Sequence, residues 1–425
     1  MDRSDLEKLS KQELVEMVLK LQRPSKTSRT SSKPPSLDRK ARRETAKPGG
    51  AKPGHKGSFR SLHESPDEIV DHRPDSCPNC ETVLDVGLLS EVVGEYDEID
   101  LPPIRPHIRR HRRLRVSCPH CHASVMGALP KAATGSVFGS GIHTLVVYLK
   151  TFHAVSFSRL EGMLDEIFGV KVSQGCLVNM LRRSFKPFET CKQKIIKDLR
   201  KANVVASDET GIRIEGLNGY HWVFESKGAI VHEVQLSRAA QVVRDIMGKH
   251  KPQVWLSDGY SAQQGHGLHH QTCLAHLARD IAYGVEASEC LVPFRLKLWM
   301  NRVFEFARNI TAYAESTLKA KTRELENTLA DILMTPSECD LATRIQAKLA
   351  RAGPRLLTFV QFPGEVEVTN NGCERLLRPS VIQRKVTNGF RSMDFAKGDC
   401  AVRTVVDTQK LNNQSPYQTL TRILS

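Results

Sequence analysis

Three carboxylates in this sequence have the type and the placement to hold a pair of divalent cations. Asp208 ends the apolar run 204–207, Asp258 ends the apolar run 254–257, and Glu374 follows much later in the chain. Two metal ions about 3.5–4 Å apart can activate the attacking oxygen and stabilise the leaving oxygen of a phosphodiester. Magnesium prefers oxygen ligands and keeps several waters, so two or three carboxylates suffice. We therefore expect Asp208, Asp258 and Glu374 to hold two Mg²⁺ or Mn²⁺ ions.

Each of these carboxylates also has a plain structural interpretation. An acid directly after a strand is common in a turn, and Glu374 lies one helical turn from Arg378, close enough for a surface ion pair. Glu209 competes with Asp208 for the role of ligand. However, side chains alternate along a strand, so Glu209 is expected to face away from Asp208.

Short apolar runs predict the elements that would position these acids. Strands are expected at 203–208, 220–225, 230–234 and 253–256, with a helix at 237–250 before the last of them. Strand, strand, strand, helix, strand is an order typical of a mixed α/β sheet. Neighbouring strands would place Asp208 beside Asp258, and a helix packed across the sheet would supply Glu374. The chain reads as mostly helical over 274–362 and again over 370–425.

Four of the eleven cysteines form two copies of one pattern, Cys77-Pro78-Asn79-Cys80 and Cys118-Pro119-His120-Cys121. A CxxC turn aims two thiolates at one point, and two such turns supply the four ligands of a tetrahedral zinc. Four thiolates leave no position for water, so the zinc would be structural. A disulfide pair or coincidence is the alternative. Cys273 and His276 also have metal-ligand types, but a packed thiol and a hydrogen-bonded histidine explain them more simply.

The net charge of +15 points to a polyanionic partner, most often nucleic acid. A basic stretch before the second CxxC turn is expected to be strand-like and to contact phosphates, with a solvated edge strand as the alternative. Its arginines are Arg105, Arg109, Arg110, Arg112, Arg113 and Arg115. Further candidates for DNA contact beside the acids are Arg378, Arg384, Lys385 and Arg391. The absence of an apolar run of about 18 residues and of a signal peptide predicts a cytoplasmic, nucleoid-associated protein with no membrane partner.

The order and spacing of several short motifs resemble the transposases of the insertion sequence 66 family. These motifs are Ser31-Ser32-Lys33-Pro34-Pro35-Ser36, Lys52-Pro53-Gly54-His55-Lys56-Gly57, the paired CPxC turns, Asp208-Glu209-Thr210, Leu256-Ser257-Asp258-Gly259-Tyr260, Cys273-Leu274-Ala275-His276, Asn371-Gly372-Cys373-Glu374-Arg375, Leu377-Arg378-Pro379, Arg384-Lys385 and Phe390. The resemblance implies an RNase H-like catalytic domain and a metal-binding triad of Asp208, Asp258 and Glu374. Asp280 stands where a basic residue would be expected, so the resemblance supports no DNA contact there.

The expected fold is multidomain α+β: an RNase H-like mixed α/β domain with a helical insertion, preceded by a zinc-ribbon-like domain and an N-terminal helix. Within the helical region before the sheet, 172–181 reads as a turn followed by a capped helix, and a helix-turn-helix is one interpretation. The expected parts are an N-terminal helix at 1–22, a basic flexible linker at 23–60, a zinc-binding domain at 61–130, a helical DNA-binding region at 131–200, the first part of the catalytic core at 201–275, a helical insertion at 276–362, and the last part of the core with C-terminal helices at 363–425.

The resemblance implies a transposase that cleaves the ends of its element and joins the freed 3′ hydroxyl to target DNA. A homo-oligomer on DNA is expected, and accessory proteins of the same element are further candidate partners. Two alternatives stay open: a non-enzymatic DNA-binding protein, such as a repressor or a domesticated transposase, and an RNase H-like nuclease without strand transfer. Three correctly ordered carboxylates favour the enzyme over the binding protein, whereas the sequence does not separate the transposase from the nuclease.

Overall fold

The computed structural model describes residues 60–129, 136–337 and 339–425, together with 54–57 and residues 10, 11, 14, 15, 17, 18, 23–27 and 29–31. It divides into two compact units, Lys40–His107 and the remainder, Met1–Arg39 with Ile108–Ser425. Most of the predicted N-terminal helix and of the predicted linker lies outside the described residues. Within the described part of the chain, no helix is long and apolar enough to cross a membrane.

A five-stranded sheet lies at the centre of the larger unit, with strand order β5-β4-β3-β6-β7. Three strands, β3 (Val204–Ile214), β4 (Leu217–Glu225) and β5 (Ile230–Gln235), form an antiparallel meander. After the helix α6 (Ala240–Met247), β6 (Val254–Ser257) returns parallel to β3. The mixed sheet and its strand-strand-strand-helix-strand order are as predicted.

A fifth strand, β7 (His269–Thr272), was not among the strands expected from the sequence. It pairs parallel with β6 at the edge of the sheet. Its residues do not alternate between apolar and polar types, because hydrogen bonds rather than an apolar face hold this strand in place. Buried Gln271 donates to the Leu356 carbonyl at 3.1 Å and accepts the Phe359 N–H at 2.8 Å.

Helices cover both faces of the sheet because side chains alternate along its strands. Trp222 and Phe224 of β4 pack with α6 and with α5 (Gln174–Leu199). Val223, between them, faces the other side and packs with α11 (Asn371–Thr387). The same side carries α12 (Met393–Leu411), whose Cys400 packs with Ile212 and Val234.

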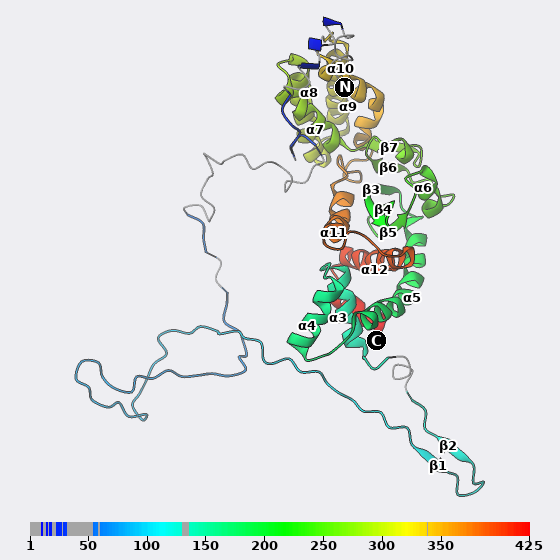
Figure 1. Ribbon diagram of the computed structural model, residues 1–425. Helices are drawn as coiled ribbons and strands as arrows, with labels where there is room; N and C mark the ends of the chain where they lie inside the picture. Colours follow the sequence, from blue (N-terminus) through cyan, green and yellow to red (C-terminus); the bar gives the residue numbers. More distant parts are fainter. Residues whose placement is uncertain are drawn as a thin grey trace. The chain divides into compact units, whose positions relative to one another are not determined.

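A separate helical core involves both the region before the sheet and the end of the chain. The helices α3 (Ser140–Thr151), α4 (Phe157–Phe168) and α5 share one apolar cluster with α12 and α13 (Pro416–Leu424). As predicted, a capped helix follows the turn: the Ser173 hydroxyl accepts the Cys176 N–H at the start of α5. Figure 1 shows these helices at one end of the sheet and α7–α10 at the other.

The predicted helical stretch over 274–362 is confirmed as four helices and short 3₁₀ turns. The helices are α7 (Leu274–Ala287), α8 (Leu291–Arg308), α9 (Glu315–Met334) and α10 (Asp340–Ala352). They enclose a core of their own around Trp299, which is fully buried and donates its indole N–H to the Leu325 carbonyl at 2.9 Å. This insertion begins directly after β7, so it adjoins the edge where β6 and β7 end.

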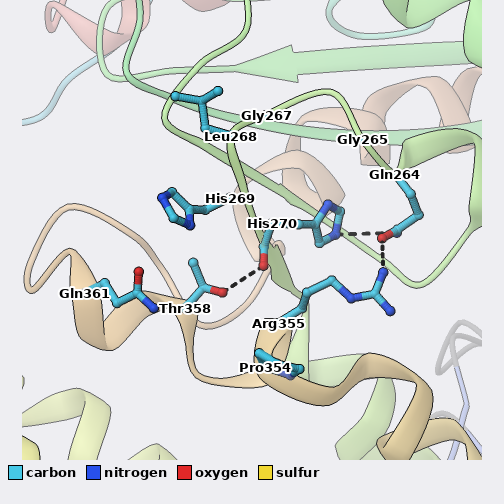
Figure 2. Close-up of a pocket in the computed structure, with 10 residues that line it drawn as sticks. All are labelled: Gln264, Gly265, Gly267, Leu268, His269, His270, Pro354, Arg355, Thr358 and Gln361. Atoms are coloured by element: carbon cyan, nitrogen blue, oxygen red, sulfur yellow. Dashed lines mark hydrogen bonds between the residues drawn. The ribbon is translucent and has the colours of Figure 1, made fainter.

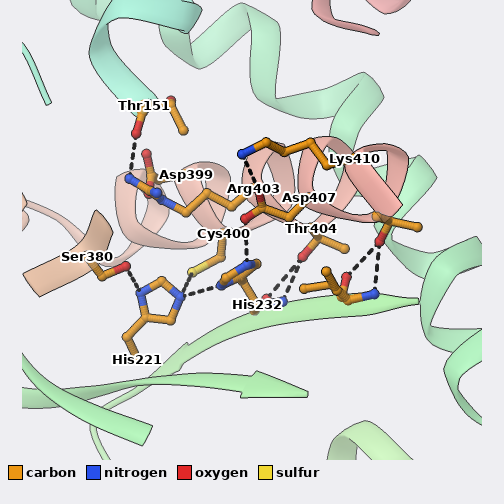
Figure 3. Close-up of polar contacts among 12 residues, drawn as sticks. Thr151, His221, His232, Ser380, Asp399, Cys400, Arg403, Thr404, Asp407 and Lys410 are labelled. Carbon is orange, nitrogen blue, oxygen red and sulfur yellow. Dashed lines mark hydrogen bonds and ion pairs between the residues drawn. The ribbon is translucent and has the colours of Figure 1, made fainter. Parts of the chain in front are cut away.

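A buried polar network joins the edge strand β5 to α11 and α12 (Figure 3). His221 contacts Ser380 at 2.8 Å and His232 at 3.0 Å, and His232 contacts Asp407 at 3.1 Å. Burial lowers the pKa of both histidines, which favours neutral rings passing hydrogen bonds in one direction toward Asp407. The network thereby fixes α11, the helix that carries Glu374, against the sheet.

Arg403 extends this network to the helical region. Its guanidinium, 1% exposed, donates to Asp399 at 2.7 Å, to the Thr151 carbonyl at 2.6 Å and to Gln383 of α11 at 3.1 Å. A buried charge is tolerated when it is paired and its donors are satisfied. One side chain thus connects the end of α3, the middle of α11 and α12.

Candidate active site and cysteine knuckles

The parallel pairing of β3 and β6 places Asp208 and Asp258 at one level of the sheet. The register pairs Ala206 with Leu256, and each acid lies two residues further on. The Asp208 carboxylate accepts the Glu209 N–H at 2.9 Å, and the Asp258 carboxylate accepts the Tyr260 N–H at 2.9 Å. The structure thus brings the two acids onto adjacent strands, Asp208 within β3 and Asp258 directly after β6. The expected end of the first strand at 208 is wrong, because β3 continues to Ile214 in its pairing with β4.

Asn370 fixes the start of the helix that carries Glu374. Its side-chain amide donates to the Ser207 carbonyl at 2.8 Å, directly before Asp208. Its backbone N–H donates to the Cys273 sulfur at 3.1 Å, and its carbonyl accepts the Glu374 N–H at 3.2 Å. Glu374 thus lies in the first turn of a helix that is tied to the carboxylate-bearing strand.

The three acids share one electrostatic environment. Burial raises the pKa of Asp208 to about 8, and the charges of Glu209, Asp258 and Glu374 add to that rise. The neutral acid is therefore well populated at neutral pH when no cation is bound. A divalent cation would relieve both the repulsion and the desolvation, so the chemistry of the donor set fits magnesium or manganese.

Glu374 is not paired with Arg378, the partner that the surface-pair interpretation required. Two nitrogens of Arg279 donate to its two carboxylate oxygens at 3.3 and 3.2 Å, and His276 Nε2 lies 3.7 Å from Oε1. About a quarter of each of these three side chains is exposed. The contact with Arg279 could not be predicted from a local pattern, because the two residues are 95 positions apart.

In the described part of the chain, no three His, Cys, Asp or Glu side chains stand close enough to hold one metal ion. Magnesium bound by two carboxylates and several waters does not require such a group. Glu374 is the acid whose present partner is a cation of the protein itself. The donor types therefore fit the ions, while the carboxylate of Glu374 is engaged by Arg279.

Glu209 faces away from the triad, as the strand alternation predicted. Its side chain, 3% exposed, accepts from Arg238 at 2.6–2.8 Å and from Gln263 at 2.6 Å. Arg238 lies over the Tyr260 ring at 3.8 Å, and the Tyr260 hydroxyl donates to the Arg238 carbonyl at 3.2 Å. Glu209 thereby anchors the loop that follows Asp258, a positioning role that the sequence did not reveal.

Cys273 is a buried thiol, which agrees with the packed interpretation rather than with a second metal site. Burial raises its pKa, so the thiol form that accepts from Asn370 is favoured. Burial also lowers the pKa of His276, which keeps that ring mainly neutral beside Glu374. Both residues of the Cys-Leu-Ala-His motif therefore contact the segment that carries Glu374.

A pocket of about 350 Å³ lies beside this site, between β7 and the end of the insertion (Figure 2). Its wall includes His270, Arg355 and Gln264, and the Gln264 amide also donates to the Asp258 carbonyl at 3.2 Å. Burial lowers the pKa of His270 to about 4, with the Arg355 charge adding to the effect. The pocket wall is therefore connected to the loop that holds Asp258.

The predicted DNA-contacting residues differ in their exposure to solvent. Arg378 and Lys385 are exposed on α11, whereas Arg384 donates to the Gly211 carbonyl of β3. The arginines of the basic stretch are exposed as well, namely Arg105, Arg109, Arg110, Arg112, Arg113 and Arg115. Their predicted strand is limited to β1 (Arg115–Ser117), which pairs with β2 (Ser124–Met126). Arg113, just before β1, is held by the Gly127 carbonyl at 2.9 Å.

The two CPxC segments adopt the same turn. In the first, the Cys77 carbonyl accepts the Glu81 N–H at 2.8 Å, and Glu81 has φ 56°. In the second, the Cys118 carbonyl accepts the His122 N–H at 2.9 Å, and His122 has φ 55°. A positive φ is uncommon outside glycine, so its occurrence at the same position of both turns indicates a shared requirement.

Hydrogen bonds within these turns favour thiolates. Contacts from Thr82 lower the pKa of Cys80, and backbone donors at Cys121 and His120 lower that of Cys118. Thiolates are the form that binds zinc. The predicted ligands Cys77, Cys80, Cys118 and Cys121 are all free thiols.

Comparison with known protein families gives two matches. The family described as "Transposase IS66 family" matches residues 135–398, which is more than half of the chain. The "zinc-finger binding domain of transposase IS66" matches residues 74–122, a range that contains both CPxC turns. No curated protein matches the chain.

Proposed function

Because the chain belongs to the IS66 transposase family, we propose that it cleaves DNA at the ends of a mobile element and joins the freed 3′ hydroxyl to target DNA. The observation that carries this proposal is the grouping of Asp208, Asp258 and Glu374. Asp208 lies within β3, Asp258 directly follows the parallel neighbour β6, and Glu374 is tied to the strand of Asp208 through Asn370. The strand order, three antiparallel strands followed by two parallel ones, supports an RNase H-like catalytic domain.

Two divalent ions, when bound, would activate the attacking oxygen and stabilise the leaving oxygen. Asp208 of β3 and Asp258 after β6 would hold the ions, and Glu374 would add a ligand from α11. Asn370 positions Glu374, while Glu209, Arg238 and Tyr260 position the loop after Asp258. Arg378 and Lys385, exposed on the same helix as Glu374, would bind phosphates of the DNA.

The zinc-finger domain implies zinc, and we assign its ligands to Cys77, Cys80, Cys118 and Cys121. Two matching turns with lowered thiol pKa values support a closed, structural site. The exposed arginines of the basic stretch would contact phosphates beside it. A homo-oligomer on nucleoid DNA in the cytoplasm, with or without accessory proteins of the element, completes the proposal.

The test is an assay for nicking and joining on DNA that carries the element ends, with Mg²⁺. Asp208→Asn, Asp258→Asn and Glu374→Gln should each lower both activities by at least about a thousandfold, because each removes a charge that stabilises the transition state. DNA binding, measured by fluorescence anisotropy, should stay near that of the parent. Asp245→Asn, an exposed change on α6, is the matched control and should retain full activity.

Two results would contradict the proposal in different ways. A parent protein that binds the ends and represses transcription but never cuts would be a non-enzymatic DNA-binding protein. A parent that nicks but yields no joined product would be a nuclease without strand transfer. Glu209→Gln is not a neutral control, because it would weaken the ion pair with Arg238 that anchors the loop after Asp258.

A further inference from the structure

Glu374 has a partner for which the proposed reaction gives no role. Arg279 of α7 places two guanidinium nitrogens against both oxygens of this carboxylate, at 3.3 and 3.2 Å. Paired contacts of this kind are among the stronger charge-assisted hydrogen bonds and leave few oxygen lone pairs open. Asp208 and Asp258 differ, since the contacts described above for their carboxylates are backbone N–H groups.

The position of Arg279 is built into the fold rather than left to a loose surface side chain. Helix α7 starts at Cys273–Leu274, where the Cys273 sulfur accepts from Asn370. Next to Arg279, Asp280 pairs with Lys348 of α10, and this ion pair holds this part of α7 against α10. Arg279 nevertheless keeps 24% of its side chain exposed, so the guanidinium has room to leave Glu374.

We propose that Arg279 takes the place of a divalent cation at Glu374 in the metal-free protein, and that an ion binds there only after displacing the guanidinium. Arg279 is then a positioning residue that sets the metal affinity of the site. This inference rests on the proposed function, because it takes Glu374 as a metal ligand.

The competition between Arg279 and a divalent ion for Glu374 should change the metal affinity by a measurable factor. If the ion pair is closed about nine-tenths of the time, the apparent metal affinity is lowered about tenfold relative to an open site. The doubly charged ion approaches the carboxylate more closely than the guanidinium does, so Coulomb attraction favours displacement once the ion loses part of its hydration. Removal of the guanidinium should therefore tighten metal binding.

The experiment measures binding of Mn²⁺ to zinc-loaded, full-length protein without DNA, by the electron paramagnetic resonance signal of free Mn²⁺. Arg279→Gln should bind Mn²⁺ roughly three- to tenfold more tightly than the parent. Arg279→Lys keeps the charge but loses the paired contact, so its affinity should lie between the two. Arg375→Gln removes a charge from an exposed neighbour of Glu374 and should change affinity less than twofold.

The outcomes separate the inference from the proposed function. Equal or weaker Mn²⁺ binding by Arg279→Gln, together with weaker binding by Glu374→Gln, would overturn the inference and keep Glu374 as a ligand. Unchanged binding by Glu374→Gln would overturn both, since Glu374 would then not be a ligand. If Arg375→Gln raised the Mn²⁺ affinity as much as Arg279→Gln, the loss of any nearby positive charge would explain the effect. That result would also overturn the inference.

Discussion

The ionised carboxylate of Asp208 destabilises the fold, and the same group is a proposed metal ligand. Its carboxylate is enclosed beside Glu209, Asp258 and Glu374, and burial is the main reason for its pKa of about 8. In the absence of a cation, the protein therefore keeps a proton there that the unfolded chain would release above its ordinary pKa. Binding of a divalent ion must expel that proton, so metal affinity should rise as the pH approaches 8.

The same residue makes a prediction about stability. A carboxyl whose pKa is raised on folding contributes stability below its unfolded pKa and loses that contribution as pH rises through the folded value. In magnesium-free buffer, Asp208→Asn should therefore gain stability relative to the parent between pH 5 and pH 8. A gain of a few kcal/mol is expected, and urea unfolding at the two pH values measures it.

The control for this measurement is Asp245→Asn, whose exposed carboxyl should give the same difference from the parent at both pH values. If Asp208→Asn shows no more pH dependence than this control, Asp208 ionises normally and the three carboxylates do not form a repulsive cluster.

At the scale of elements, the close contact of α12 with α5 depends on a residue without a side chain. A Cβ on Gly398 of α12 would lie 2.1 Å from the Phe185 ring of α5, far inside contact distance. Gly398→Ala should therefore force the helices apart and lower the free energy of unfolding by about 1–3 kcal/mol. Thermal or urea unfolding would measure this loss.

Gly162 in the middle of α4 is the matched control. A Cβ there would meet nothing closer than a side-chain oxygen of Glu166 at 3.9 Å. Because glycine is a poor helix former, Gly162→Ala should stabilise the protein by about 0.5–1 kcal/mol. Equal effects from the two alanines would show that the packing of α12 on α5 does not set the stability of this region.

The sequence predicted the elements wherever a local pattern carries them. The apolar run before Asp258 became β6, and Ser173 capped α5 as expected. The run before Asp208 became only the first part of β3, which continues to Ile214. The strand β7 was missed because the Gln271 amide donates to Leu356 and the His270 carbonyl accepts from Thr358, both far away in the sequence, whereas no apolar face marks the strand. Polar groups that are hydrogen-bonded by residues far away in the sequence leave no periodic pattern from which a strand could be predicted.

The candidate site, too, could be predicted only where a local pattern marks its residues. Its three acids could be chosen by residue type and by the strands they follow, and Glu209 could be set aside by alternation. Arg279, His276 and Asn370 could not be assigned roles, because their contacts with Glu374 and Ser207 join segments far apart in sequence. These residues position a carboxylate or the strand that bears one, whereas the three acids supply the negative charge of the site.

At the scale of the whole molecule, the surplus of positive charge predicts strongly salt-dependent DNA binding. Five of the six exposed arginines of the basic stretch, when changed together to Gln, should lower the slope of log affinity against log salt by up to about 4.5 units. They are Arg105, Arg109, Arg110, Arg112 and Arg113. Anisotropy titrations over a range of salt concentrations give the slope.

Arg302→Gln with Lys319→Gln is the control for charge loss elsewhere. These cations already pair with Glu324 and Glu315, so their loss should leave the slope nearly unchanged. A slope unaffected by the five arginine changes would place the phosphate contacts on other surfaces of the protein.

The packing of α12 and α13 against α3, α4 and α5 has a consequence for synthesis. The helices α3, α4 and α5 are translated before the sheet and α7–α10, whereas α12 and α13, which complete their apolar core, are translated after them. Glu374, too, emerges only after the whole insertion. A nascent or prematurely terminated chain would therefore expose unburied helices and lack the third acid. Such fragments would be substrates for proteolysis, and they would lack the complete set of acids on which the proposed activity depends.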